Sequence, residues 1–191
     1  METMLEFAVS KCGTFLATRG SARAAREDLE SRIVSRGHVD TIMIDFADVE
    51  AMTISFADEF LGRFYASLAA GDVPADGVLL LGLNEETREA VSICLERRDL
   101  VAAGLSDGQL TLLAASEFLT ETYRQALTLA TFSTAELSDA LKTSPQNTNN
   151  RLKRLVAAGA VQRRRVAPER GGKEFAYSVT SQVTGPALSG P

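Results

Sequence analysis

The sequence is poor in the residues that metal sites and nucleophilic catalysis need. It has one histidine, His38, and two cysteines, Cys12 and Cys94, which lie far apart and form no Cys-x-x-Cys pair. A histidine-rich zinc site is therefore excluded, and a Ser-His-Asp triad would depend on His38 alone. Cys94 lies in an apolar run with helical spacing, so we expect a small core residue there.

Phosphate-binding loops and membrane signals are also lacking. The sequence contains neither Gly-x-x-x-x-Gly-Lys-Ser/Thr nor Gly-x-Gly-x-x-Gly, and it has no zinc-ligand spacing. No apolar run approaches the ~20 residues that span a bilayer. Glu2 and Glu6 stand where a signal peptide would be basic. These absences predict a cytoplasmic protein with reduced thiols, without cofactor, metal or membrane partner, and without enzymatic activity.

Charge is distributed unevenly along the 191 residues, which have a formal net charge of −5. Residues 1–116 hold 10 basic and 19 acidic side chains, whereas residues 142–173 hold nine basic and one acidic. A basic region on an acidic protein indicates that this region alone meets a polyanion. A chance clustering of solvated charges is the alternative. The length and the 45% hydrophobic content allow one large domain or two small ones.

Residues 144–156 predict a helix with two different faces. Ser144 is a good N-cap, and Pro145 then falls at the first helical position, where its missing N–H costs nothing. Thr148, Leu152 and Leu155 share one face, and amide and basic side chains cover the other. Such a polar face suits base edges and phosphates in a major groove, with an ordinary solvated helix as the alternative. The residues that we expect to contact DNA from this helix are Ser144, Gln146, Asn147, Asn150, Arg151, Lys153 and Arg154.

The flanking segments complete a DNA-binding pattern. Ser133 to Glu136 has capping-box spacing and starts a short helix, and residues 142–144 give a tight connection to the next helix. Two short helices joined in this way indicate a helix-turn-helix whose second helix is the reader. Residues 160–167 and 173–179 can form strands, joined by a turn-rich segment as in a hairpin. The hairpin residues that we expect to contact phosphate or the minor groove are Arg163, Arg165, Arg170 and Lys173.

The run Leu-Lys-Arg-Leu-Val-Ala-Ala-Gly-Ala-Val at residues 152–161 resembles the junction of recognition helix and wing in winged helix-turn-helix regulators of the MarR-like and ArsR-like type. The resemblance covers roughly the last third of the chain. It implies a winged domain over residues 116–180 that binds double-stranded DNA. Residues 181–191 form a tail of small residues, which we expect to be disordered.

Strands and helices alternate in the rest of the chain, which predicts an α/β fold with helices packed on one sheet. Residues 39–46 form the clearest strand, because their nearly continuous apolar run is typical of a buried central strand. The expected elements are strands at 4–9, 15–18, 39–46, 78–83 and 108–115, with helices at 21–36, 55–70 and 84–103. Ser21, Ser55 and Asn84 are the expected N-caps of these helices.

Three short runs of this region resemble a STAS-like domain family of unknown function. They are Thr-Arg-Gly-Ser-Ala at 18–22, Ile-Asp-Phe-Ala-Asp-Val-Glu at 44–50 and Ser-Phe-Ala-Asp-Glu-Phe at 55–60. The resemblance covers about residues 5–115 and implies a STAS-like mixed sheet with packed helices, acting as a regulatory domain over residues 1–115. The parent STAS group includes anti-sigma-factor antagonists, which are not enzymes and switch partners when a kinase phosphorylates a serine.

Ser55 falls on the position of that acceptor serine, although Thr53 and Phe56 replace the aspartate and glycine that surround it in the antagonists. We expect Ser55 to be a plain N-cap, with phosphorylation of Ser55 or Thr53 as the alternative. Asp58 and Glu59 could act as an acid–base or metal-binding pair. More often such residues interact with the helix dipole or with a nearby arginine, for which Arg19 is the candidate.

The amphipathic residues 116–130 leave one boundary open. They can close the first domain, begin the second, or be shared by both. We therefore expect a two-domain transcription regulator whose first domain receives a signal from a regulatory protein or a kinase. The alternatives are a partner-switching adaptor that binds no DNA and an enzyme built around Asp58 and Glu59. The oligomeric state stays open, a homodimer included.

Overall fold

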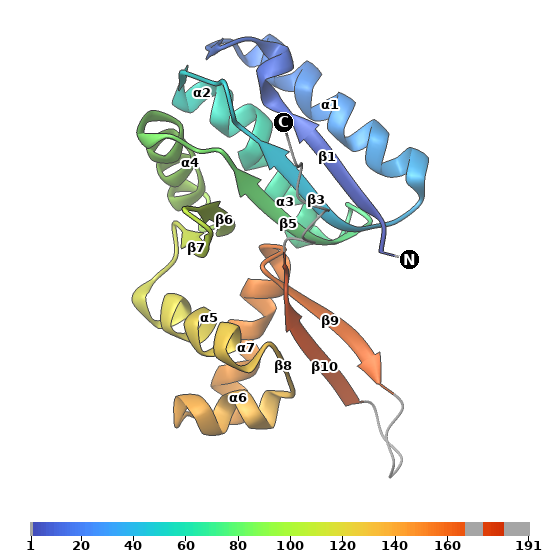
Figure 1. The fold of residues 1–191 in the computed structure, drawn as a ribbon, viewed down its shortest axis with the longest axis vertical. Coiled ribbons are helices and arrows are strands. Elements are labelled where there is room, and N and C mark those ends of the chain that lie inside the picture. The colour runs from blue at the N-terminus through green and yellow to red at the C-terminus, as the bar shows by residue number, and fades with distance from the viewer. Residues whose placement is uncertain (1, 167–173, 182–191) are drawn as a thin grey trace, which may run out of the picture.

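The computed structural model describes residues 2–166 and 174–181, and its fold is mixed α/β (Figure 1). The N-terminal half is built on a five-stranded sheet of order β1-β3-β5-β6-β7, in which β7 alone is antiparallel to its neighbour. The elements of this half are β1 (Met4–Ala8), η1 (Val9–Cys12), β2 (Phe15–Leu16), α1 (Arg19–Arg36), β3 (Val39–Asp45), β4 (Ala51–Met52), α2 (Ile54–Ala57), the π-helical turn η2 (Asp58–Gly62), α3 (Arg63–Ala70), β5 (Ala75–Leu81), α4 (Glu85–Arg97), β6 (Ala102–Ser106) and β7 (Gln109–Leu113). The predicted mixed sheet with packed helices is thus present.

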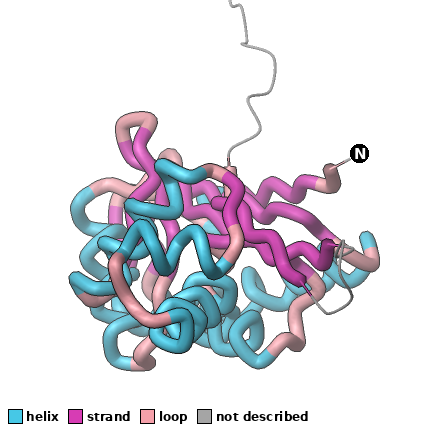
Figure 2. The backbone as a smooth tube through the Cα atoms, turned by 90° about the horizontal axis from the view of Figure 1, so that it is seen from below, coloured by secondary structure: helices cyan, strands magenta, loops and turns pink. Residues whose placement is uncertain are grey.

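The C-terminal half places three helices beside a small antiparallel sheet of order β8-β10-β9. Figure 2 shows the backbone from below, with helices in cyan and strands in magenta. The elements are α5 (Glu117–Leu129), β8 (Thr131–Phe132), α6 (Thr134–Leu141), α7 (Pro145–Ala157), β9 (Val161–Val166) and β10 (Glu174–Val179). Arg170, Lys173 and most of the predicted disordered tail lie outside the described residues.

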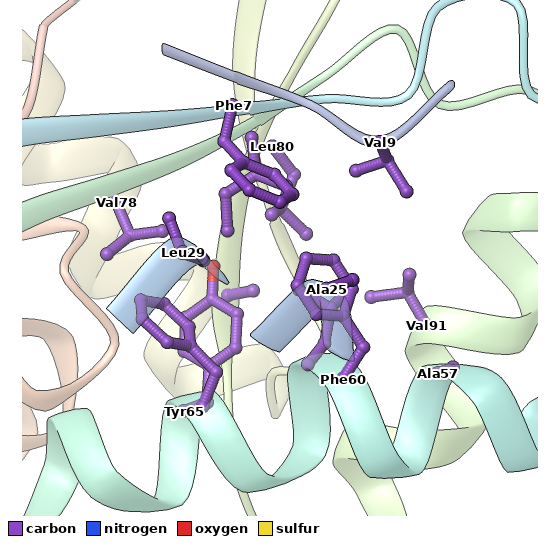
Figure 3. Packing of buried hydrophobic residues seen from close by; sticks show 14 of the residues in the cluster. Phe7, Val9, Ala25, Leu29, Ala57, Phe60, Tyr65, Val78, Leu80 and Val91 are labelled. Carbon is purple, nitrogen blue, oxygen red and sulfur yellow. The ribbon is translucent and has the colours of Figure 1, made fainter. Parts of the chain in front are cut away.

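One face of the five-stranded sheet is covered by α1, by the α2–η2–α3 segment and by α4. Phe7 and Leu80 project from the strands toward Leu29 of α1 and Phe60 of η2, and all four are buried (Figure 3). The rings of Phe7 and Phe60 have centroids 5.9 Å apart. The apolar run predicted as a central strand lies in this core, because β3 pairs with β1 on one side and β5 on the other.

The opposite face of the same sheet is covered by the C-terminal half. Side chains alternate along a strand, so Leu79 points away from the face that Val78 and Leu80 share. Leu79 belongs to a second buried cluster with α5 and α7. The members of this cluster include Leu79, Val101, Ala103, Leu119, Tyr123, Ala126, Leu152, Leu155, Ala158 and Val161. Helix α5 therefore packs on both halves, which is one of the arrangements that the sequence left open.

Gly159 joins the two halves at close range. Its carbonyl accepts a hydrogen bond from Val78 N at 2.9 Å. Its φ is +68°, and a Cβ atom at this position would lie 2.6 Å from Val78 N. Only glycine satisfies both conditions without strain, since the backbone conformation is left-handed and the space is occupied.

Several predicted element ends were wrong. The helix expected over 84–103 ends at Arg97, and Ala102–Ser106 is the strand β6. This strand contains two alanines and no β-branched residue, so residue propensities do not predict a strand here. Its pairing with β5 and β7 stabilises it. The N-cap of α1 is Thr18 rather than Ser21, because the Thr18 hydroxyl accepts from Ser21 N at 3.2 Å.

Candidate nucleic-acid interface and arginine cluster

Helices α6 and α7 are closed by the caps that the sequence predicts. Ser133 and Glu136 form a capping box, in which Ser133 N donates to the Glu136 carboxylate at 2.7 Å. Lys142 ends α6 in the left-handed conformation, with φ +51°. The Ser144 hydroxyl then accepts from Asn147 N at 3.3 Å and starts α7. The two helices are therefore fixed in a tight helix–turn–helix.

The polar face of α7, the predicted reader helix, is divided into two parts. Gln146, Asn147 and Asn150 in the first two turns are exposed. Arg151 is only half-buried and is held by α5, where its Nη1 donates to Thr122 Oγ1 at 3.1 Å. Its guanidinium carbon also lies 5.5 Å from the ring centroid of Phe118. The open part of the face thus carries amides and Lys153, whereas Arg151 is held by α5.

Arg154 lies on the exposed polar face of α7 and contacts the N-terminal half. Its Nη2 donates to Asp99 Oδ1 at 2.7 Å, in the turn after α4. Helical periodicity shows which side of α7 faces its own core, but it does not show that the N-terminal half meets the opposite side. Neither Arg151 nor Arg154 is unpaired in this structure, and their contact with DNA stays a prediction.

A groove runs between α7, the β9–β10 sheet and the end of α3. Its volume is about 380 Å³. Lys153 and Arg163 line it together with Tyr177 and Asp76. The register pairs Arg163 with Tyr177 and Arg165 with Phe175, so the two arginines share a strand face, as the predicted alternation requires. Of the residues predicted to contact DNA, Lys153 and Arg163 therefore line the same groove.

The first turn of α2 contains both candidate phosphoacceptors. The N-cap is Thr53 and not Ser55, because the Thr53 hydroxyl accepts from Phe56 N at 3.2 Å. The same hydroxyl donates to Ala17 O at 2.9 Å. The prediction of Ser55 as N-cap was wrong because two hydroxyl residues lie two positions apart, and the sequence does not show which has extended backbone. Ser55 is exposed, so it is the better placed acceptor of the two.

Glu59 lies at the centre of an arginine cluster, although its side chain is only 3% exposed. Asp58, beside it, accepts from Arg98 Nε at 2.7 Å. The predicted pairing of Arg19 is present, since its Nη1 lies 3.6 Å from Asp58 and 3.8 Å from Glu59. The other arginine nitrogens near the Glu59 carboxylate are those of Arg23 at 3.5 Å, Arg26 at 3.6 Å and Arg63 at 3.0 Å.

These contacts set the charge of both carboxyl groups. Burial raises the pKa of Glu59, but Arg63 and Arg23 outweigh it and hold the pKa below its usual value. The hydrogen bond from Arg98 lowers the pKa of Asp58. A general acid at neutral pH needs a shift in the opposite direction. The pair therefore suits arginine binding better than acid–base chemistry.

Sequence reasoning missed one group of residues at the other end of the sheet. His38 Nε2 lies 3.1 Å from Asp76 Oδ2 and 4.0 Å from Asp40 Oδ1. In residues 2–166 and 174–181 this is the one group of three ligand-type side chains within metal-binding distance. The pairing of β3 with β5 brings the two aspartates together, and no pattern in the sequence indicates it. His38 and Asp76 are exposed, and such groups are common without a metal.

Comparison with known proteins adds no relative. No family model matches the chain, and neither a curated protein nor a solved structure does. The two family resemblances therefore rest on the residues quoted for them. Within the part of the chain that the structure describes, no helix is long and apolar enough to cross a membrane.

Proposed function

We propose that the protein is a DNA-binding transcription regulator of the cytoplasm. In this proposal the C-terminal half binds duplex DNA, and the N-terminal half receives a signal by protein contact or phosphorylation. The observations that carry it are the exposed amide face of α7 and the groove that Lys153 of the same helix lines together with Arg163 of β9. The caps of α6 and α7 support it further, because they fix the short turn between two helices that a helix-turn-helix also has.

In this proposal, base recognition and phosphate binding are carried out by different residues. Asparagine and glutamine side chains can pair with adenine through two hydrogen bonds, and Gln146, Asn147 and Asn150 are placed to do so. Arg163 and Arg165 carry charge on a strand beside the helix, which suits phosphate or minor-groove contacts. Lys153 lies between these two sets and belongs with the phosphate contacts.

A signal received by the N-terminal half has a short path to the reader helix. The second buried cluster contains strand residues of the sheet and core residues of α7. The Arg154–Asp99 ion pair and the Val78–Gly159 hydrogen bond cross the same boundary. A shift of the sheet or of α4 on partner binding would therefore move α7 directly. Exposed Ser55 is the candidate site for a kinase.

The test is selection of bound sequences from a random duplex pool by the full-length chain, followed by titration at several salt concentrations. The logarithm of the binding constant should fall with the logarithm of salt, with a slope near −0.9 for each phosphate neutralised. A selected consensus with this slope supports the proposal. Failure of the folded protein to enrich any sequence or to bind duplex at low salt contradicts it.

The alternative is an adaptor that binds protein instead of DNA, and one surface favours it. Phe118 and Leu127 of α5 are both exposed, Phe118 to 70%, and a contiguous apolar patch can mark a protein-interaction site. A groove of about 490 Å³ runs along the same helix, lined by Leu110, Leu112 and Leu127. Binding there would depend on apolar burial and would respond weakly to salt, which separates it from DNA binding.

A further inference from the structure

We propose that Arg19, Arg23 and Arg63 form a receptor for a phosphate monoester group. The three side chains come from the first turns of α1 and from the start of α3, and they surround buried Glu59. The proposal does not depend on DNA binding, because it concerns a surface of the N-terminal half.

The cluster carries more positive than negative charge. Five guanidinium groups meet the three carboxylates of Glu30, Asp58 and Glu59 in this cluster. Arg26 is well satisfied, since its Nε donates to Glu59 O and its Nη1 to both oxygens of Glu30, each at 3.2 Å. Arg98 is bound to Asp58. The excess positive charge therefore rests on the remaining three arginines.

These three guanidinium groups are held in place and are still open to solvent. The side chains of Arg19, Arg23 and Arg63 are 57%, 61% and 54% exposed. Arg63 donates to Glu59 through Nε, and Arg23 does the same, so the terminal nitrogens of both remain for another acceptor. A buried carboxylate that orients the arginines reduces the entropy that an incoming ligand must remove.

The start of α1 also favours a bound anion. This 18-residue helix has no acidic residue in its first turn, where negative charge would be favourable, and carries Arg19 there instead. The positive end of the helix dipole and the charge of Arg19 therefore lie at the same place, and both attract an anion. A phosphate monoester has three oxygens and up to two charges, so it can accept from several arginine forks at once. A carboxylate has fewer acceptors and would engage fewer of them.

The phosphoryl group can come from two sources. Ser55 precedes Glu59 by four residues, so it lies on the same side of the helix, and the Thr53–Ala17 hydrogen bond holds this segment beside the start of α1. A phosphate carried by Ser55 would therefore reach the arginines within the chain. The other source is a phosphoryl group on a separate molecule.

The first experiment titrates the full-length chain with O-phospho-L-serine and inorganic phosphate, followed by calorimetry and ³¹P NMR. The double variant Arg19→Gln with Arg23→Gln should weaken binding by about tenfold or more. Arg97→Gln with Arg124→Gln removes the same charge from α4 and α5 and should leave binding within about twofold. Equal weakening by both pairs would mean general charge attraction and would overturn the proposal.

The second experiment places phosphoserine at position 55 through an expanded genetic code. If the source lies within the chain, the ³¹P signal of this residue should titrate at lower pH than in the Arg19→Gln, Arg23→Gln background, and added phosphoserine should bind about tenfold more weakly. If the source is separate, added phosphoserine binds as before. Either result supports the receptor. The proposal fails if the parent chain binds no phosphate probe and the ³¹P titration is insensitive to the arginines.

Discussion

Arg154 of α7 and Asp99 of the turn after α4 form an ion pair, with Arg154 Nη2 2.7 Å from Asp99 Oδ1. One residue belongs to the proposed reader helix and the other to the N-terminal half. Asp99 has a positive φ of 51°, so its carboxylate is presented from a tight turn. Because of this pair, the position of α4 affects whether Arg154 is available to contact DNA.

We expect Asp99→Asn to strengthen DNA binding by roughly two- to tenfold and to steepen the salt slope by about one phosphate contact, because Arg154 is released. Asparagine tolerates the left-handed conformation, so folding should be little affected. The pair is exposed, and its loss should cost at most about 1 kcal/mol. Asp107→Asn is the control, since it removes the same charge from an exposed turn with φ +52°. Equal strengthening by both variants would rule out a specific release of Arg154.

Asn150→Ala should relax sequence preference at one base pair and leave binding to scrambled duplexes nearly unchanged. The amide is exposed on the open part of α7, and a good bidentate pair gives about 1–3 kcal/mol of discrimination. Binding titrations on selected and scrambled duplexes measure the difference. A similar loss on both duplexes would show that Asn150 reads no base.

Arg163→Ala with Arg165→Ala should weaken binding to all duplexes and flatten the salt slope by up to about two phosphate contacts. Both residues lie on one face of β9, and Arg163 lines the groove that α7 borders. The same titrations at several salt concentrations give the slope. The assignment of these arginines to phosphate is refuted if the double variant retains full affinity for both duplexes.

Thr53→Ala should lower the free energy of unfolding by about 0.5–2 kcal/mol, because it removes the N-cap of α2. Ser55→Ala should change it by no more than about 0.5 kcal/mol, since Ser55 is exposed and caps nothing. Urea unfolding of the two variants compares them directly. The reverse order of effects would restore Ser55 as the cap.

Acid should destabilise the protein through Asp58 and Glu59. Their folded-state pKa values lie below the ordinary 3.8 and 4.5, so the unfolded chain binds protons first as the pH falls. The stabilisation is therefore complete above about pH 5 and is lost as the pH falls through the lowered values. Arg98→Gln removes the main cause of the Asp58 shift. Its unfolding free energy should fall less steeply with acid than that of Arg97→Gln, measured in urea from pH 6 to 3.

Local signals in the sequence predict the N-caps of α6 and α7 well and the assembly of the halves poorly. Ser133 and Ser144 act within a few residues of themselves, so capping rules suffice for them. The left-handed conformation of Lys142 at the end of α6 does not follow from these rules, which favour glycine or asparagine there. The apolar run at residues 78–83 indicates a strand buried on both faces. It does not indicate that α5 and α7 supply the second cover, because that depends on contacts with residues far along the chain, such as Leu119 and Leu152.

The arginine cluster, too, is predicted only in part. The sequence suggests Arg19 as a partner of Asp58 and Glu59, and the structure places it there. Arg63 and Arg98 lie on other elements, and their approach follows from the packing of α3 and α4. The choice of Thr53 over Ser55 depends on backbone angles of −74° and 152°, which residue types alone do not specify.

The shared second cluster means that neither half is a complete module. Excising residues 116–181 would uncover Leu79, Val101 and Ala103 on one product and the apolar faces of α5 and α7 on the other. Both products would carry the kind of surface that drives aggregation. A chain of this design cannot be recombined by exchanging its C-terminal half for that of another protein unless the sheet face is exchanged with it. In the proposed function, substitutions on the open turns of α7 are the changes that leave this shared core intact.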